Sequence, residues 1–235
     1  MTKNGIDVSK YQENIAWKQV KDSGIDFAII KAGGSDDGFY TDPTYEANYK
    51  NAKAVGMPVG AYYIVGPYCV SKEDGIADAK RFLKMLEGKT FEYPVYIDLE
   101  LTSPTTKTGT TDAVIAFCKT MEAAGYFCGI YASDISGFKE RLELSHLKTR
   151  ALWVASYGSM PKYVSSYGIW QKSSTGRVPG IVGDVDIDEC YVDYPAIIKS
   201  RGDNGFPAPS APKKKNMEVT IEYDDHIYSG LLAEE

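Results

Sequence analysis

Short runs of β-branched and aromatic residues recur along residues 5–191, and most of them begin or end at Gly, Pro or Asp. Runs of this length and composition are typical of β-strands with buried faces. We predict eight strands, over Gly5–Val8, Phe27–Ala32, Pro58–Val65, Val95–Glu100, Phe127–Ala132, Leu152–Ser156, Gly168–Lys172 and Val185–Tyr191.

The segments between the first five predicted strands, and the one after the fifth, mix apolar and polar positions as amphipathic helices do. We predict helices over Ile15–Ser23, Pro43–Val55, Lys72–Leu86, Thr111–Ala124 and Phe138–Lys148. A glycine stands just after each of the first four, where a left-handed residue ends a helix: Gly24, Gly56, Gly88 and Gly125.

Strands and helices therefore alternate through the first five units, which predicts parallel βαβ connections. Later the pattern changes, because segments 157–167 and 173–184 are too short and too rich in Gly, Pro and Ser for a crossover helix. We predict an α/β fold: a closed TIM-type barrel whose last three strands lack helices, somewhat smaller than the usual barrel of roughly 250 residues.

The C-terminal part has a different composition. Residues 206–216, FPAPSAPKKKN, are typical of an exposed Pro/Lys-rich linker, and residues 217–235 alternate apolar and polar positions around Asp224-Asp225 as a β-hairpin does. We therefore divide the chain into a barrel (1–205), a linker (206–216) and a hairpin segment (217–235). An isolated hairpin is marginally stable, so we expect this one to serve wall binding or oligomerisation.

Composition narrows the class of protein. The 235 residues are 43% hydrophobic and 25% charged, with a formal net charge of −6, and no run of 18 apolar residues occurs. A core can form, and neither a membrane protein nor a disordered chain is indicated. The acidic balance and the absence of phosphate-binding glycine motifs argue against a nucleic-acid partner. The N-terminal MTKNGIDVSKYQ lacks the pattern of a secretory signal, so we expect synthesis in the cytoplasm.

Metal and cysteine chemistry have little support. Only His146 and His226 occur, and the four cysteines form no CxxC pair, so we expect buried free thiols, no metal site and no cofactor. Asp184, Asp186 and Asp188 imitate the start of a calcium loop. However, Glu189 stands where that loop needs Gly, and Pro195 stands where it needs Glu.

Carboxylates carry the strongest chemical signal. Asp98 and Glu100 close the fourth predicted strand, YPVYIDLE, and alternation places both on one face at the end where barrels have active sites. We expect their mutual repulsion and burial to raise one pKa while the other stays low. Such a pair suits glycoside cleavage, which needs a proton donor and an anion. A helix cap or a lysine partner explains a lone DxE motif equally well.

Two more acids favour the catalytic interpretation. Asp7 lies inside the first predicted strand and Asp186 inside the eighth, and these strands become neighbours when a barrel closes. Carboxylates in such positions are costly unless they have a function. The many aromatic residues near strand ends suit either sugar stacking or barrel packing.

Seven motifs, in order, together resemble the lysozymes of glycoside hydrolase family 25. They are GIDVSKYQ, FYTDPTYEANYKNAKAVGMPVGAYY, PVYIDLE, GYFCGIYAS, LWVASYG, GIWQKSS and VDIDECY, and they cover about residues 5–200. The resemblance implies an irregular (β/α)5(β)3 barrel. It also implies cleavage of the β-1,4 bond between N-acetylmuramic acid and N-acetylglucosamine in peptidoglycan.

The resemblance also implies roles for individual residues. Glu100 matches the general acid and Asp98 its anionic partner, while Asp7 and Asp186 match two further acids of the groove. The implied substrate-binding residues are Tyr11, Tyr62, Tyr63, Tyr131, Trp170 and Gln171. The chain departs from the family at Ala32–Gly38, AGGSDDG, where ATEG is frequent, and at Tyr63, where a histidine is frequent.

The preferred interpretation is a phage or prophage endolysin that lyses Gram-positive cell walls after release by a holin or by lysis of the producing cell. A chitinase-like glycosidase and a non-catalytic binder of wall carbohydrate are the alternatives. Both carboxylates of the DxE motif are present, which argues against the non-catalytic alternative.

Overall fold

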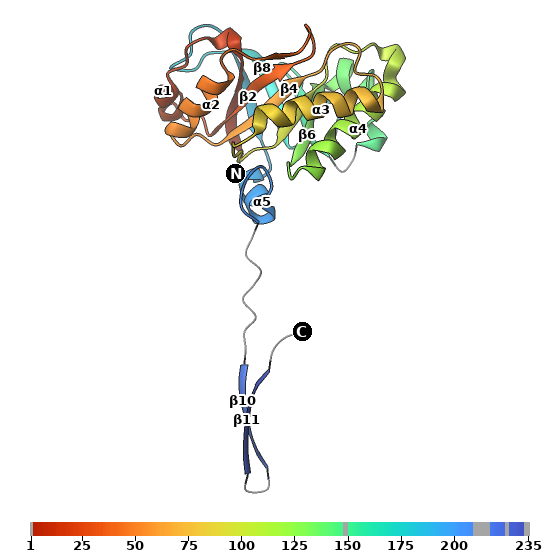
Figure 1. Cartoon of the computed structure of the whole chain (residues 1–235). Coiled ribbons are helices and arrows are strands. Elements are labelled where there is room, and N and C mark those ends of the chain that lie inside the picture. Colours follow the sequence, from red (N-terminus) through yellow and green to blue (C-terminus); the bar gives the residue numbers. More distant parts are fainter. Residues whose placement is uncertain (1, 148–149, 209–216, 224–225, 233–235) are drawn as a thin grey trace.

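The computed structural model describes residues 2–147, 150–208, 217–223 and 226–232 (Figure 1). Its main sheet has nine strands. Eight of them close into a barrel, because β1 pairs with both β2 and β9. The barrel strands are β1 (Lys3–Val8), β2 (Phe27–Gly34), β4 (Val59–Ile64), β5 (Val95–Asp98), β6 (Cys128–Ser133), β7 (Ala151–Ala155), β8 (Ile169–Gly176) and β9 (Val185–Cys190).

Helices cover the outside of the barrel, and Figure 1 shows α3 and α4 side by side against one flank. The α-helices are α1 (Trp17–Asp22), α2 (Tyr45–Ala54), α3 (Lys72–Leu86), α4 (Lys107–Ala123) and α5 (Tyr194–Arg201). The start of α3 has a clear local cause: Ser71 and Asp74 form a reciprocal capping box that satisfies two free backbone N–H groups. At its other end Gly88 has a φ of 71°, the left-handed conformation expected after a helix.

The predicted barrel is confirmed, and each of the eight predicted strands overlaps one barrel strand. The predicted helix over Phe138–Lys148 is wrong. A π-helical turn (Asp134–Lys139) and a 3₁₀ turn (Leu144–His146) occupy its described part, and Lys148 lies outside the described residues. The buried Asp134 carboxylate accepts backbone N–H groups of residues 162–164. This contact fixes the start of the segment in an irregular turn.

The late connections that lack a helix go together with a change of strand direction. The first seven barrel strands run parallel, whereas β9 runs antiparallel to both β8 and β1. An antiparallel neighbour needs no crossover helix, which explains the short loop before β9. The β1–β9 register places Asp7 directly opposite Asp186, so closure of the barrel brings these two acids together.

The barrel interior is filled with aromatic rings, which include Phe27, Tyr93, Tyr96 and Trp153. The N-terminal end of the barrel is closed by α5, whose Tyr194 packs edge-on against Tyr93 and Phe127. Asn204 bonds the backbone at Tyr93 and Phe127, which ties the segment after α5 to that same end. The opposite end, where the parallel strands finish, is left open.

Two smaller features complete the described structure. Strand β3 (Tyr40–Thr41) pairs with the end of β2, and β10 (Met217–Tyr223) with β11 (His226–Leu232) forms the separate two-stranded hairpin predicted for the C-terminal segment. All four cysteines are free and buried, as expected. Within the described ranges, no helix has the length and hydropathy needed to cross a membrane.

Candidate active site

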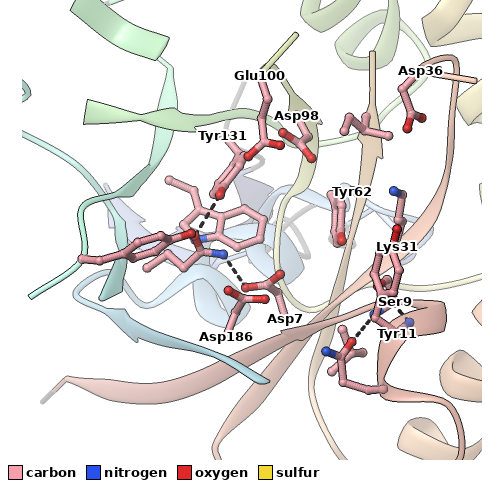
Figure 2. A pocket seen from close by; sticks show the side chains of 16 residues that line it. Asp7, Ser9, Tyr11, Lys31, Asp36, Tyr62, Asp98, Glu100, Tyr131 and Asp186 are labelled. Atoms are coloured by element: carbon pink, nitrogen blue, oxygen red, sulfur yellow. Dashed lines mark hydrogen bonds between the residues drawn. The ribbon is translucent and has the colours of Figure 1, made fainter. Parts of the chain in front are cut away.

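A pocket of about 340 Å³ opens at the C-terminal end of the barrel strands. Eight of the ten residues proposed from the sequence line it: Asp7, Tyr11, Tyr62, Asp98, Glu100, Tyr131, Gln171 and Asp186. Figure 2 shows Asp98 and Glu100 on one side of the pocket and Asp7 and Asp186 on another. The topology thus gathers carboxylates that lie far apart in the sequence, from β1, β9 and the end of β5.

Asp98 and Glu100 differ in their access to the pocket. Asp98 is the last residue of β5 and only 4% exposed, and its Oδ1 has no hydrogen-bond partner among the described residues. Glu100 stands two residues further on and is exposed. Of the two, Glu100 is therefore better placed to exchange a proton with a molecule in the groove.

Burial raises the pKa of Asp98 well above its usual range, and the neighbouring Glu100 carboxylate raises it further. Although the Glu100 side chain is partly exposed, the protein around the pocket desolvates its carboxyl and raises its pKa, and the Tyr131 hydroxyl and the Lys31 cation oppose that shift. The expectation that one pKa would stay low is therefore wrong, because desolvation acts on both groups. Such a pair retains one proton to higher pH than isolated carboxyls do.

Asp7 and Asp186 form the second pair. Asp7 is 6% exposed, and burial together with the nearby Asp188 and Asp186 carboxylates raises its pKa well above the ordinary value. Burial and the charge of Glu100 raise the pKa of Asp186 to about 6. Electrostatic coupling thus extends across the pocket from one pair to the other.

Gln171 joins these groups into a network. Its Nε2 donates to Asp7 Oδ2 at 2.7 Å, and its Oε1 accepts from the hydroxyls of Tyr131 at 2.8 Å and Tyr157 at 3.1 Å. All four hydrogen-bonding groups belong to residues of the pocket. This network orients the Tyr131 hydroxyl beside Glu100.

Aromatic rings form one wall of the pocket. Tyr62 and Tyr131 pack against Trp153, with ring centroids 6.0 Å and 4.4 Å away. Tyr11 is 76% exposed at the rim. Flat rings beside hydrogen-bonding groups are suited to holding a sugar.

Lys31 is a pocket residue that the sequence analysis did not identify. It is 8% exposed on β2, and its charge lowers the pKa of both Asp98 and Glu100. It is the one charged residue in the otherwise apolar strand FAIIKAGG. The argument applied to Asp7, a charge inside a buried strand, would have found it. Asp36, which also lines the pocket, lies in the AGGSDDG segment that departs from the family pattern.

We expect Lys31→Met to shift the acid limb of the pH–activity profile to higher pH. Without the cation, ionisation of the Asp98–Glu100 pair becomes less favourable, so the pKa values of both carboxyls rise. The measurement is kcat/KM against pH. Lys53→Met, which removes a lysine paired with Glu92 outside the pocket, is the matched control and should keep the wild-type profile. An unshifted limb in Lys31→Met would contradict the role given to this cation.

The other two residues proposed from the sequence, Tyr63 and Trp170, do not line the pocket. Side chains alternate along a strand, so Tyr63 points away from its neighbour Tyr62. It packs near Phe82 and Phe117 beneath the helices and donates to Asp78 at 3.1 Å. Trp170 likewise faces away from Gln171 and donates to the backbone oxygen of Ser156 at 2.8 Å. The structure therefore places both residues outside the pocket in which we expected them to bind substrate.

We expect Tyr63→Phe to lower stability and leave catalysis unchanged. The substitution removes a donor to the buried Asp78 carboxyl, which costs about 1–3 kcal/mol of the free energy of unfolding. Denaturant unfolding measures this loss, and kcat/KM should stay at the wild-type value. Tyr62→Phe is the matched comparison, because its hydroxyl faces the pocket and its loss should raise KM. A higher KM for Tyr63→Phe would restore the original assignment.

Over the described ranges, no group of three or more His, Cys, Asp or Glu side chains is placed to hold a metal ion. The described pocket residues offer a bound molecule carboxyls, the Lys31 ammonium, hydroxyls, the amides of Gln12 and Gln171, and aromatic faces.

An open barrel end with paired carboxylates and aromatic walls defines a carbohydrate-hydrolase type of site, and comparison with known proteins agrees. The model of the glycosyl hydrolases family 25 matches residues 6–181. An autolytic lysozyme of Clostridium acetobutylicum is 31% identical over 186 residues, which cover 79% of this chain and 55% of that protein. The chain therefore belongs to glycosyl hydrolases family 25.

Solved structures agree with the barrel. The CTP1L endolysin has a TM-score of 0.72 at 29% identity, covering 84% of this chain and 69% of that chain. The autolysin LytC of Streptococcus pneumoniae, solved with a synthetic peptidoglycan ligand, has a TM-score of 0.70 at 26% identity, covering 81% and 47%. This chain thus spans about half the length of LytC and of the clostridial lysozyme.

Proposed function

We propose that this protein is a muramidase, which hydrolyses the β-1,4 bond between N-acetylmuramic acid and N-acetylglucosamine in peptidoglycan. The observation that carries the proposal is the pocket itself. A carboxyl pair with raised pKa values faces a second acidic pair across this pocket, and aromatic rings line one of its walls. Family membership and the ligand of LytC support the choice of substrate.

In this mechanism Glu100 donates the proton to the leaving oxygen, because it is the more exposed member of its pair. Burial alone favours a proton on Asp98, whereas the Lys31 cation favours its ionised form. We propose that Asp98 is the anion of the pair once positive charge develops at the sugar carbon, and that it stabilises this charge. Lys31 keeps the pair from retaining a second proton. Gln171 holds Asp7 and Tyr131 in fixed positions through one hydrogen bond to each.

The test is the identity of the new reducing end. Purified peptidoglycan is digested, the products are reduced with borohydride, and mass spectrometry identifies the terminal sugar alcohol. Reduced N-acetylmuramic acid is the expected end group. Reduced N-acetylglucosamine, or no release, would refute the proposal.

The two alternative functions predict different results when released products are analysed in this way, with chitin oligomers tested beside peptidoglycan. A chitinase-like enzyme would release products from chitin oligomers at a comparable or higher rate. A non-catalytic binder would sediment with the wall and release nothing. We favour the hydrolase because both members of the DxE pair line the pocket.

We further propose that the protein acts as an endolysin on Gram-positive walls, held in the cytoplasm of its producer until a holin or cell lysis releases it. The endolysin and autolysin relatives support this setting. A lysis panel of Gram-positive species measures the host range.

The domain division and the role of residues 217–235 belong to the same proposal. Strands β10 and β11 pair only with each other in the described sheets, and we propose that this hairpin serves wall binding or oligomerisation. Truncation after Gly205 should then leave hydrolysis of soluble peptidoglycan fragments unchanged and weaken lysis of intact cells, because attachment raises effective concentration only on a surface. Equal loss on both substrates, or no loss on either with an unchanged mass in solution, would refute this role.

A further inference from the structure

Asp188 of β9 is a buried carboxyl that does not line the pocket. The residue is fully buried, and its Oδ1 accepts the indole N–H of Trp153 at 2.8 Å. Its Oδ2 has no hydrogen-bond partner among the described residues. An ionised carboxylate with a single donor would be costly at this depth, so the protonated form is favoured.

The sheet register places Asp188 beside Asp7. Across β1 and β9, Asp7 is opposite Asp186, and Gly5 is opposite Asp188. Residues two apart on a strand share a face, so Asp188 is the diagonal neighbour of Asp7 on the inner side of the barrel. The two carboxyls are close enough for the charge of Asp188 to raise the pKa of Asp7.

Two carboxyls in contact do not both ionise readily. Asp7 reaches the pocket, and its Oδ2 already accepts a hydrogen bond from Gln171 at 2.7 Å. Asp188 lies deeper, where desolvation of a charge is most costly. The shared proton is therefore better held by Asp188, and Oδ2, the oxygen without a partner, is the atom that can carry it.

We propose that Asp188 is a positioning residue, which stays protonated and donates a hydrogen bond to Asp7. Gln171 and Asp188 together then hold the Asp7 carboxylate toward the substrate. The inference rests on the proposed hydrolase function, since it acts through an acid of that pocket. Trp153, whose ring forms part of the pocket wall, fixes the other oxygen of Asp188.

The surroundings of Asp188 set the pH at which this contact is lost. The titratable groups that act on it or respond to it are Asp7 of β1, Asp186 and Cys190 of β9, Tyr96 of β5 and Lys172 of β8. Burial is the largest cause that raises the pKa of Asp188 to about 8. Above that pH two adjacent carboxylates repel each other, and activity should decline.

Three variants test the proposal through kcat/KM on peptidoglycan fragments between pH 5 and 9. Asp188→Asn keeps a donor toward Asp7 and an acceptor for Trp153. It should therefore retain most activity at pH 6 and change the alkaline limb, leaving only the decline that deprotonation of Glu100 causes. Asp188→Ala removes both contacts and should lower kcat/KM by about 10²-fold, the scale of a misplaced catalytic group. Asp184→Asn, an exposed aspartate of the same segment paired with Arg177, should match the wild type. An unchanged alkaline limb in Asp188→Asn overturns the proposal, even if Asp188→Ala does not fold.

A carboxyl titration by ¹³C NMR separates this inference from the proposed function, because it needs no substrate. Asp188 should titrate at higher pH than Asp7, and Asp188→Asn should lower the midpoint of Asp7. If Asp7 has the higher midpoint, the inference fails whether or not the protein cleaves peptidoglycan. If the titrations agree and the wild type releases no sugar, the proposed function fails.

Discussion

Glu100→Gln is expected to slow hydrolysis by about 10²- to 10⁴-fold, the usual contribution of a general acid. Glutamine keeps the shape of the side chain and its place beside Tyr131 but has no proton to donate to the leaving oxygen. The measurement is kcat on defined peptidoglycan oligomers near the wild-type pH optimum. Thermal unfolding should show an intact fold.

The leaving group provides a sharper readout for the same variant. The nitrophenolate group of a nitrophenyl glycoside can leave without being protonated, so Glu100→Gln should lose far less activity on such a substrate than on peptidoglycan. Glu140→Gln is the matched control, because Glu140 is exposed in the loop after β6 and does not line the pocket. Near wild-type hydrolysis of peptidoglycan by folded Glu100→Gln would refute the assignment.

Most of the fold could be predicted because the barrel strands are apolar runs between turn residues. The exceptions have local causes. Helix α5 was missed, although Pro195 lies in its first turn and Gly202 ends it with a φ of 72°, which is the usual asymmetry of proline and glycine at helix ends. The false helix after β6 was predicted to begin at Phe138, directly after Gly137, and this completely buried ring imitates the apolar face of a helix. Tertiary contacts of Asp134 decide that segment, and no local pattern shows them.

The candidate site was predictable where strand alternation or the pairing of neighbouring barrel strands determines which side chains meet. Alternation places Asp98 and Glu100 on one face, and closure of the barrel brings Asp7 to Asp186. The same alternation indicates that adjacent Tyr62 and Tyr63 do not both face the pocket. The prediction for Tyr63 rested on the family resemblance and not on strand geometry. The pKa values of the acids depend on burial by residues from all around the barrel, which a linear sequence does not reveal.

Asp98→Asn is expected to lower kcat by about 10²- to 10³-fold, the scale of a lost electrostatic contact to a transition state. Its buried carboxylate can face the developing cation without competition from water, and asparagine keeps the shape without the charge. The loss should persist on a nitrophenyl glycoside, because the charge is needed whatever the leaving group. This behaviour separates Asp98 from Glu100, and equal rescue of both variants by the activated substrate would contradict their distinct roles.

The product anomer tests how the charge is used. Asp98 and Glu100 come from one strand end, which places them poorly for attack on opposite faces of a sugar ring. The N-acetyl group of the substrate can itself be the nucleophile while Asp98 stabilises the resulting cation, an arrangement known among glycosidases. We therefore expect retention, measured by NMR of the first-formed sugar before mutarotation. An inverted product would instead indicate a water activated by Asp7 or Asp186 across the pocket. Asp98 would then no longer be assigned as the group that stabilises the cation.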